Sequence, residues 1–447
     1  MKKELHYYDI FPKVFIINEE AHITIKPLGS HASFAEKVTV NVHSMIHGNP
    51  VKYPERNNIT TYELTPDADG SLRFSHVFTE ESEYCIRILQ ENKPAVSLSI
   101  YALEEDMRGR HPYRGDLHMH TNRSDGQQEP AIVAANYRKA GYDFTVISDH
   151  HRYYPSLEAT DAYKNVPIEM NIVIGEEVHL PGNDIHIVNF GGKYSVNGLL
   201  ETSVQSKESS RRAVIDNPPA VLTEEQYRAE VNALAEALNI PDGIEKFTYA
   251  ACVWIFNHIR NGEGLGIYAH PYWILPEGYQ VPETLSEYIT ATHPFDAFEV
   301  LGGERYYQHN GFQAIRYYED KAKGINYPIV GSTDSHSSLI EHNPGALIAS
   351  TFVFARENER AALISAIKDC YTVALDTISA EYRMVGDLRL VKYARFLMDD
   401  FTPLHDDLCY EEGRLMKAYV TGEDGAAEAL NFIHGRMKKL YEKYFAV

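Results

Sequence analysis

The chain has 447 residues, more than one typical domain, and its hydrophobic content of 44% is enough for a sizeable core. Its formal net charge of −21 disfavours long-range attraction to nucleic-acid polymers and to anionic membranes. No stretch approaches the roughly 18 apolar residues of a membrane span, and the N-terminal stretch lacks the apolar run of a signal peptide. The 4 cysteines form no C-x-x-C pair, so we interpret them as reduced thiols and expect a cytoplasmic protein without a membrane partner.

The first part of the chain has the composition of a β domain. Short runs rich in β-branched residues alternate there with clusters of Gly, Asn, Pro and Asp. These runs cover residues 14–17, 22–25, 38–42, 84–88 and 96–100. We therefore expect a small β-sandwich-like domain over residues 1–105, followed by a charged linker.

From residue 113 the pattern changes to strands that alternate with helices. Predicted strands cover 144–147, 172–174, 184–190, 266–269, 297–300, 328–330, 351–354 and 372–375. Predicted helices cover 130–140, 248–260, 311–323 and 357–370. This pattern predicts an α/β domain over 113–380, with a parallel sheet or barrel and an insertion at about 195–245 that contains a capping-box sequence at Thr223. Residues 381–447 are predicted to form a helical C-terminal extension, which would either cover the barrel or mediate formation of a homo-oligomer.

The first cluster of ligand-type residues contains His118 and His120. They are two residues apart, so at a strand end both imidazoles point to the same side. Asp125 follows five residues later, beside Gly126, which permits a tight turn. Imidazole and carboxylate together suit Zn, Mn or Fe better than Ca or Mg. Two surface histidines on a loop would give the same short pattern, so this motif alone is weak.

The second cluster follows the strand predicted over 144–147 and contains Asp149, His150 and His151. His150 is a candidate ligand, and Asp149 is well placed to fix the tautomer of a ligand histidine. A capping Asp followed by an ordinary loop His would give the same residues. This cluster is therefore also ambiguous when it is taken by itself.

The third cluster follows the strand predicted over 172–174. Glu177 could bridge two metal ions with its two oxygens, whereas Glu176 would point to the opposite side of the strand. His186 lies in the next predicted strand. The alternative is a charged rim of a β-hairpin, which is common.

Two further strands end in His270 and in the pair Asp334 and His336, which repeats the spacing of the first cluster. All five clusters thus lie at predicted C-terminal ends of strands in one α/β region. In a parallel barrel those ends form the rim of the active site. Convergence of the clusters would make a multinuclear metal centre, which indicates hydrolysis.

The order and content of these five motifs resemble the PHP (polymerase and histidinol phosphatase) family of metal-dependent phosphoesterases, over about residues 113–378. The resemblance implies a distorted (β/α)7 barrel with a trinuclear centre of Mn, Fe or Zn. The nine ligands that it implies are His118, His120, Asp125, His150, Glu177, His186, His270, Asp334 and His336. Asp125 matches the branch of the family with Asp at that position. The sequence Ser148–His151 departs from the commoner T-D-H-N, which leaves the role of His151 open.

A centre of this kind suits phosphate esters. Three divalent ions carry +6 and three carboxylates supply −3, so an excess of positive charge faces a substrate whose own negative charge grows in the transition state. A metal-bound hydroxide is the expected nucleophile. Expected catalytic helpers are Asp149, His151, Arg152 and Arg305, with Arg123 as a further cation near the rim.

We therefore expect hydrolysis of the phosphate ester of a small metabolite or short nucleotide. One alternative is a 3′–5′ exonuclease or polymerase-associated proofreading activity, which the acidic charge disfavours. The other is a non-catalytic binding or sensor protein in which the metals are structural. Structural metal sites tend to be closed and mononuclear, and this argues against that alternative.

Overall fold

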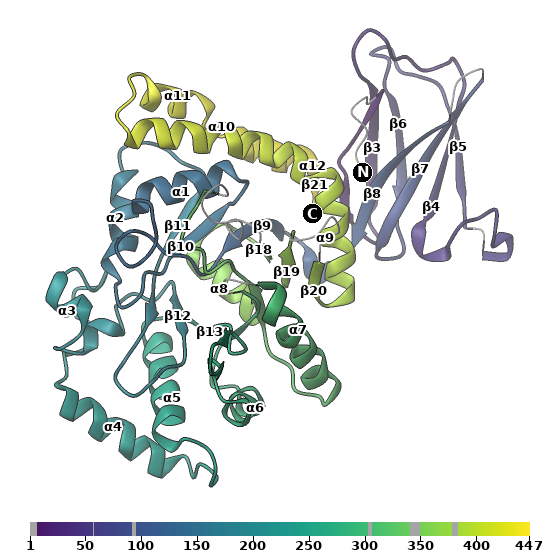
Figure 1. The fold of residues 1–447 in the computed structure, drawn as a ribbon. Helices are drawn as coiled ribbons and strands as arrows, with labels where there is room; N and C mark the ends of the chain where they lie inside the picture. Colours follow the sequence, from purple (N-terminus) through teal and green to yellow (C-terminus); the bar gives the residue numbers. More distant parts are fainter. Residues whose placement is uncertain (1–6, 57, 92–94, 303–305, 340–348, 378–382) are drawn as a thin grey trace. The chain divides into compact units, whose positions relative to one another are not determined.

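The computed structural model describes residues 7–56, 58–91, 95–302, 306–339, 349–377 and 383–447 (Figure 1). The chain divides into two compact units, and each is considered by itself. The first unit consists of Met1–His111, Lys392–His405 and Gly435–Val447, and the second consists of Pro112–Val391 and Asp406–His434. No described helix is both long enough and apolar enough to span a bilayer.

The first unit contains two β-sheets. One has three strands in the order β1-β3-β6, and the other has six in the order β21-β2-β8-β7-β4-β5. The strands are β1 (Tyr8–Phe11), β2 (Val14–Ile16), β3 (Glu20–Pro27), β4 (Val38–Ser44), β5 (Thr60–Leu64), β6 (Leu72–Val77), β7 (Ser82–Gln90), β8 (Val96–Leu103) and β21 (Phe445–Ala446). Short 3₁₀ turns lie at Met45–His47, Pro54–Arg56 and Glu105–Met107.

The two sheets share one apolar core. Burial alternates along β4, as expected for a strand with one face turned inward. Side chains from both sheets, such as Ile10 and Ile23 from one and Val40 and Ile86 from the other, belong to the same buried cluster. The β runs recognised in the sequence therefore form two layers of sheet.

The C-terminal helices are divided between the two units. They are α9 (Leu388–Asp400), α10 (Thr402–Val420), α11 (Ala426–Ile433) and α12 (Arg436–Tyr444). In the first unit, the Tyr444 ring lies 5.0 Å from the Phe401 ring, and β21 pairs with β2. In the second unit, Arg138 donates to Glu412 at 2.5 Å in a buried ion pair. Residues 381–447 are thus shared between the two units. In the second unit, Leu415, Met416 and Leu430 belong to a buried apolar cluster with residues of α1 (Pro130–Lys139).

The second unit is built on a ten-stranded sheet with the order β17-β16-β13-β12-β11-β10-β9-β18-β19-β20. Its strands are β9 (His111–Asp116), β10 (Phe144–Ile147), β11 (Asn171–Val178), β12 (Ile187–Phe190), β13 (Leu265–Tyr268), β16 (Ala297–Leu301), β17 (Ile329–Gly331), β18 (Ala349–Ala355), β19 (Thr372–Asp376) and β20 (Arg383–Gly386). A parallel bridge between Met119 and Ser335 joins the chain beyond β9 to the chain beyond β17, so the sheet is nearly closed. The predicted α/β class is confirmed.

The sheet also departs from a regular parallel repeat. β12 runs antiparallel to both β11 and β13, and β18, β19 and β20 form an antiparallel extension. A short hairpin of β14 (Ile274–Leu275) and β15 (Gly278–Tyr279) follows β13. Strand direction cannot be read from residue periodicity, which is the same for parallel and antiparallel strands.

Helices follow most of the strands of this unit. They are α1 (Pro130–Lys139), α2 (Tyr154–Ala162), α3 (Val204–Glu208), α4 (Glu224–Ala237), α5 (Lys246–Asn261), α6 (Glu283–Thr292), α7 (Tyr306–Ala322) and α8 (Arg360–Lys368), with a 3₁₀ turn at Asn197–Leu199. The capping box predicted at Thr223 is confirmed, because its side chain and that of Gln226 each accept from the other's backbone N–H. Tyr227 and Val231 of α4 are buried in a cluster with Trp254 of α5, so the insertion packs onto the barrel helices.

Candidate metal centre

The sheet brings the nine predicted ligand side chains together. His118 and His120 follow β9, His150 follows β10, Glu177 lies near the end of β11, and His270 follows β13. The remaining four are Asp125, His186, Asp334 and His336. They converge because β9, β10 and β11 run parallel, as do β13, β16 and β17, so that the carboxyl ends of the strands in each set share one edge.

An inner group consists of His118, His120, Glu177 and Asp334. His118 Nε2 lies 3.2 Å from both Glu177 Oε2 and Asp334 Oδ1. His120 Nε2 lies 3.4 Å from Glu177 Oε2 and 2.9 Å from Asp334 Oδ1. Two atoms that each bind one cation at about 2.1 Å are about 3.0–3.4 Å apart, so this spacing fits a single ion.

Several polar atoms of the centre are buried and make no well-formed hydrogen bond, although some of them lie within 3.2 Å of one another. They are His118 Nε2, His120 Nδ1, both oxygens of Glu177, His186 Nδ1 and both ring nitrogens of His270. A buried polar atom without a partner costs free energy, and native proteins contain few of them. Imidazole nitrogens and carboxylate oxygens that face one another in this way suit a divalent cation such as Zn, Mn or Fe.

The backbone is strained at the same place. Asp334 has φ of 50° and His270 has φ of 21°, and His151 beside the centre has φ of 61°. Non-glycine residues avoid this region of φ, and those that occupy it cluster at functional sites. The strain therefore supports a functional role for these loops.

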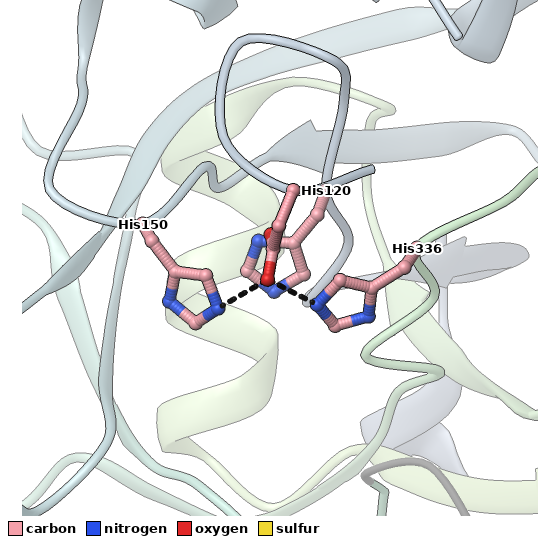
Figure 2. A group of neighbouring side chains, drawn as sticks. His120, His150 and His336 are labelled. Atoms are coloured by element: carbon pink, nitrogen blue, oxygen red, sulfur yellow. Dashed lines mark ion pairs between the residues drawn. The ribbon is translucent and has the colours of Figure 1, made fainter. Parts of the chain in front are cut away.

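An outer group consists of Asp125, His150 and His336. Asp125 Oδ2 lies 3.2 Å from His336 Nε2 and 3.6 Å from His150 Nε2, and His120 belongs to the same group of possible ligands. Figure 2 shows the rings of His120, His150 and His336 close together. Burial alone would raise the pKa of Asp125, but the hydrogen bond from His336 and the charge of His150 hold it well below its usual range. Asp125 is 54% exposed, so this group faces solvent.

Glu177 lies between these groups. Its Oε2 faces the inner group and also lies 2.8 Å from His150 Nδ1, whereas its Oε1 lies 2.7 Å from His186 Nδ1. Burial alone would raise the pKa of Glu177, but the surrounding histidines, His150 and His186 above all, hold it well below its usual range. A carboxylate whose two oxygens face different sets of ligands has the geometry of a bridging ligand.

Glu299 of β16 was not recognised in the sequence. Its Oε2 lies 3.0 Å from His118 Nδ1, and its Oε1 is buried without a hydrogen-bond partner. Burial raises the pKa of Glu299 to about 7. A carboxylate at this position holds the proton of His118 on Nδ1 and leaves Nε2 to face Glu177 and Asp334. The available signal was a single charged residue inside the apolar strand Ala297–Leu301.

His179 was also missed, although it follows Glu177 by two residues. Its Nε2 lies 3.5 Å from Glu177 Oε1 and 2.8 Å from His150 Nδ1. Burial is the main reason that the pKa of His179 is lowered to about 4. The sequence feature that indicates a role for His179 is its spacing of two residues from Glu177, which places both side chains on the same side of a strand.

The predicted catalytic helpers have partners that the sequence did not reveal. Asp149 accepts hydrogen bonds from the backbone and hydroxyl groups of Thr121 and Ser124, so it holds the loop before Asp125 where we had expected it to orient a histidine. His151 is half-buried, with its ring 4.6 Å from that of His179.

The cations near the rim are already paired. Arg152 binds Glu208 of α3 with two hydrogen bonds of 2.6 and 2.8 Å. Arg123 pairs with Glu129 and with Glu158. Arg152 and Glu208 are 56 residues apart in the chain, so no local pattern could indicate their contact. Arg305 lies outside the described residues.

No protein-family model matches the chain, and no curated protein matches it. Among solved structures, the chain is similar to a two-domain protein from Bacteroides vulgatus that contains a predicted PHP-like metal-dependent phosphoesterase, with 15% identity and a TM-score of 0.38. That match covers 60% of this chain and 65% of the Bacteroides protein, so it spans less than two thirds of the length of the Bacteroides protein.

Two further solved structures are similar at the same level. One is a proposed metal-dependent phosphoesterase from Bifidobacterium adolescentis, with 17% identity, coverage of 50% of this chain and 87% of that chain, and a TM-score of 0.31. The other is an amidohydrolase from Chromobacterium violaceum with bound sulfate and no metal, with 16% identity, the same two coverages and a TM-score of 0.30. Likenesses this distant do not assign an activity to this chain. Its activity has to be inferred from the geometry of its own site.

Proposed function

We propose that this chain is a metal-dependent phosphoesterase with a distorted (β/α)7 barrel and a trinuclear centre. The observation that carries the proposal is the convergence of buried imidazoles and carboxylates, several of whose polar atoms make no well-formed hydrogen bond. The inner group would hold one cation, and the outer group would hold another. His186 and His270 would hold the third together with the second oxygen of Glu177.

The balance of charge favours a phosphate ester over a neutral substrate. Three divalent cations supply +6, and Asp125, Glu177 and Asp334 supply −3. Glu299, when ionised, would reduce the excess from about +3 to about +2. A positive excess that remains after the ligands are counted stabilises the charge that develops on a phosphoryl group.

When bound, the cations supply Lewis-acid polarisation of the phosphoryl oxygens and lower the pKa of water. The protein's own residues hold the proposed ligands in place. Glu299 holds the tautomer of His118, and Asp149 holds the loop that carries Asp125. Exposure of Asp125 leaves one side of the centre open to an ester.

His151 is our candidate for proton transfer. Its imidazole lies beside the centre and contacts the ring of His179 at 4.6 Å. Burial, followed by the charge of His150, lowers the pKa of His151, so the ring is neutral near neutral pH. A neutral imidazole at the edge of the centre can accept a proton from the attacking water and return it to the leaving alkoxide.

The test is an assay of purified protein, with its metal content measured, against generic phosphomonoesters and phosphodiesters. We expect release of alcohol that a chelator abolishes and that added Mn, Fe or Zn restores. An absence of chelator-sensitive hydrolysis of every ester would remove the proposal. Degradation of labelled single-stranded nucleic acid at physiological salt would instead favour an exonuclease.

A further inference from the structure

Trp273 borders the centre on the side of His186 and His270. Its indole lies 5.7 Å from the His270 ring, nearly perpendicular to it, and 5.9 Å from the His186 ring. The indole is half-buried. A large aromatic surface is thus partly open to solvent next to two of the proposed ligands.

The loop that carries Trp273 is held at several points. Trp273 N donates to His270 O at 3.0 Å, and Gln280 N donates to Trp273 O at 2.8 Å. Tyr272 is 5% exposed, and its hydroxyl accepts a hydrogen bond of 3.0 Å from Arg316 Nε in α7. The backbone of Trp273 is thus held before binding, which limits the conformational entropy that this residue loses when a ligand stacks on it.

Two cations that the sequence places near the rim of the centre, Arg152 and Arg123, already have carboxylate partners. Arg152 is occupied by Glu208, and Arg123 is occupied by Glu129 and Glu158. A second anionic group on the substrate that bound Arg152 or Arg123 would have to displace the carboxylate that already pairs with it. An uncharged organic group avoids this competition with Glu208, Glu129 and Glu158.

We propose that Trp273 forms the subsite for the organic part of the ester and selects flat, uncharged groups, such as aromatic rings. The proposal rests on the proposed phosphoesterase function. It identifies Trp273 as a residue that determines specificity and leaves the chemical step to the centre.

The test compares benzyl phosphate with butyl phosphate, or their methyl diesters if diesters are the esters hydrolysed. Both leaving groups are primary alkoxides, so the chemical step is similar and only the flat ring differs. We expect Trp273→Ala to raise KM for the benzyl ester about tenfold, to change KM for the butyl ester less than about twofold, and to leave kcat similar for both, because stacking on an aromatic ring is lost. Trp273→Phe should recover most of the difference. Equal effects on both esters would overturn the proposal.

A binding measurement gives a readout that does not depend on turnover. The chain has 2 tryptophans, and Trp254 is buried with its Nε1 hydrogen-bonded to Glu230, so Trp254→Phe leaves Trp273 as the single indole fluorophore. In this variant, loaded with metal, benzylphosphonate should change the emission and bind about tenfold more tightly than butylphosphonate. Unchanged emission, or equal affinity for the two phosphonates, would also overturn the proposal.

These outcomes separate the two proposals. Chelator-sensitive hydrolysis of both esters without selectivity at Trp273 would overturn this inference and leave the phosphoesterase function intact. An absence of chelator-sensitive hydrolysis would remove both.

Discussion

The inner and outer groups use the same kinds of side chain in opposite environments. His118, His120 and Glu177 are fully buried, whereas Asp125 is 54% exposed and His336 is 24% exposed. Burial removes water from the inner ligands, so in the absence of a cation their polar atoms have few partners. The outer ligands can be solvated instead. The inner group should therefore bind its ion tightly and exchange it slowly, whereas the outer group should exchange its ion readily.

The origin of the difference lies in the fold. The inner side chains lie at or just beyond the ends of β9, β11 and β17, whereas Asp125 comes from a loop that Asp149 holds through Thr121 and Ser124. The same sheet thus supplies a buried site and a more exposed site. A substrate would therefore approach the centre from the side of the outer group.

The largest effect is expected from Asp334→Ala in the inner group. The substitution removes a carboxylate that faces His118, His120 and His270, so we expect loss of the inner ion and a fall in activity of about a thousandfold or more. Metal analysis by mass spectrometry and an ester assay measure both effects. Circular dichroism should show a retained fold, and His120→Ala should behave alike. Near-normal turnover in both variants would contradict the assignment of these ligands.

A smaller effect is expected from Asp125→Ala in the outer group. One ion should be lost per chain, and activity should fall about a hundredfold, while the inner ion remains. The measurement is the metal-to-protein ratio after dialysis, with wild type and Asp334→Ala treated in parallel. If Asp125→Ala loses every ion, the two groups are not independent and the comparison fails.

The strand ends that carry ligand pairs could be predicted from the sequence. The spacing of His118 and His120, repeated by Asp334 and His336, places two side chains on one side of a strand end, and the alternation of strands and helices places these ends together. The structure places His118, His120 and Asp334 in the inner group with Glu177. It places His336 in the outer group, with its ring 4.5 Å from that of His120. Periodicity and spacing are local properties, and these parts of the site depend on them.

The remaining features depend on contacts between distant segments. Glu299 acquires its role only because β16 lies where its carboxylate reaches His118, 181 residues away in the chain. Arg152 has a guanidinium group that could bind phosphate, but Glu208 of the insertion forms an ion pair with it. The direction of β12 and the division of the C-terminal helices between two units likewise follow from tertiary packing, which no short pattern encodes.

The third prediction tests the metal affinity of the inner group with the substitution Glu299→Gln. The amide keeps the shape of the side chain but removes the negative charge beside His118. Loss of the carboxylate that orients a ligand histidine typically weakens metal binding by about 10–100-fold. Competition against a chromophoric chelator measures the inner affinity directly. The matched control is Glu176→Gln, which changes an equally buried carboxylate that Ser195 and Asn197 hold away from the centre. Equal loss of metal affinity in both variants would show that the effect is general and does not come from His118.

The fourth prediction concerns pH. Burial alone would lower the pKa of His118, but the charges of Asp334, Glu177 and Glu299 outweigh it and raise that pKa well above the ordinary value. Without metal, His118 therefore carries a proton near neutral pH, and an incoming cation must displace it. The affinity of the inner group should rise with pH and fall by up to about tenfold for each unit of acidification. Because Glu299 is one of the charges that raise this pKa, Glu299→Gln should flatten the dependence between pH about 6 and 8. An affinity that stays constant over that range in the wild-type protein would mean that no proton is displaced and that His118 is neutral before the cation binds.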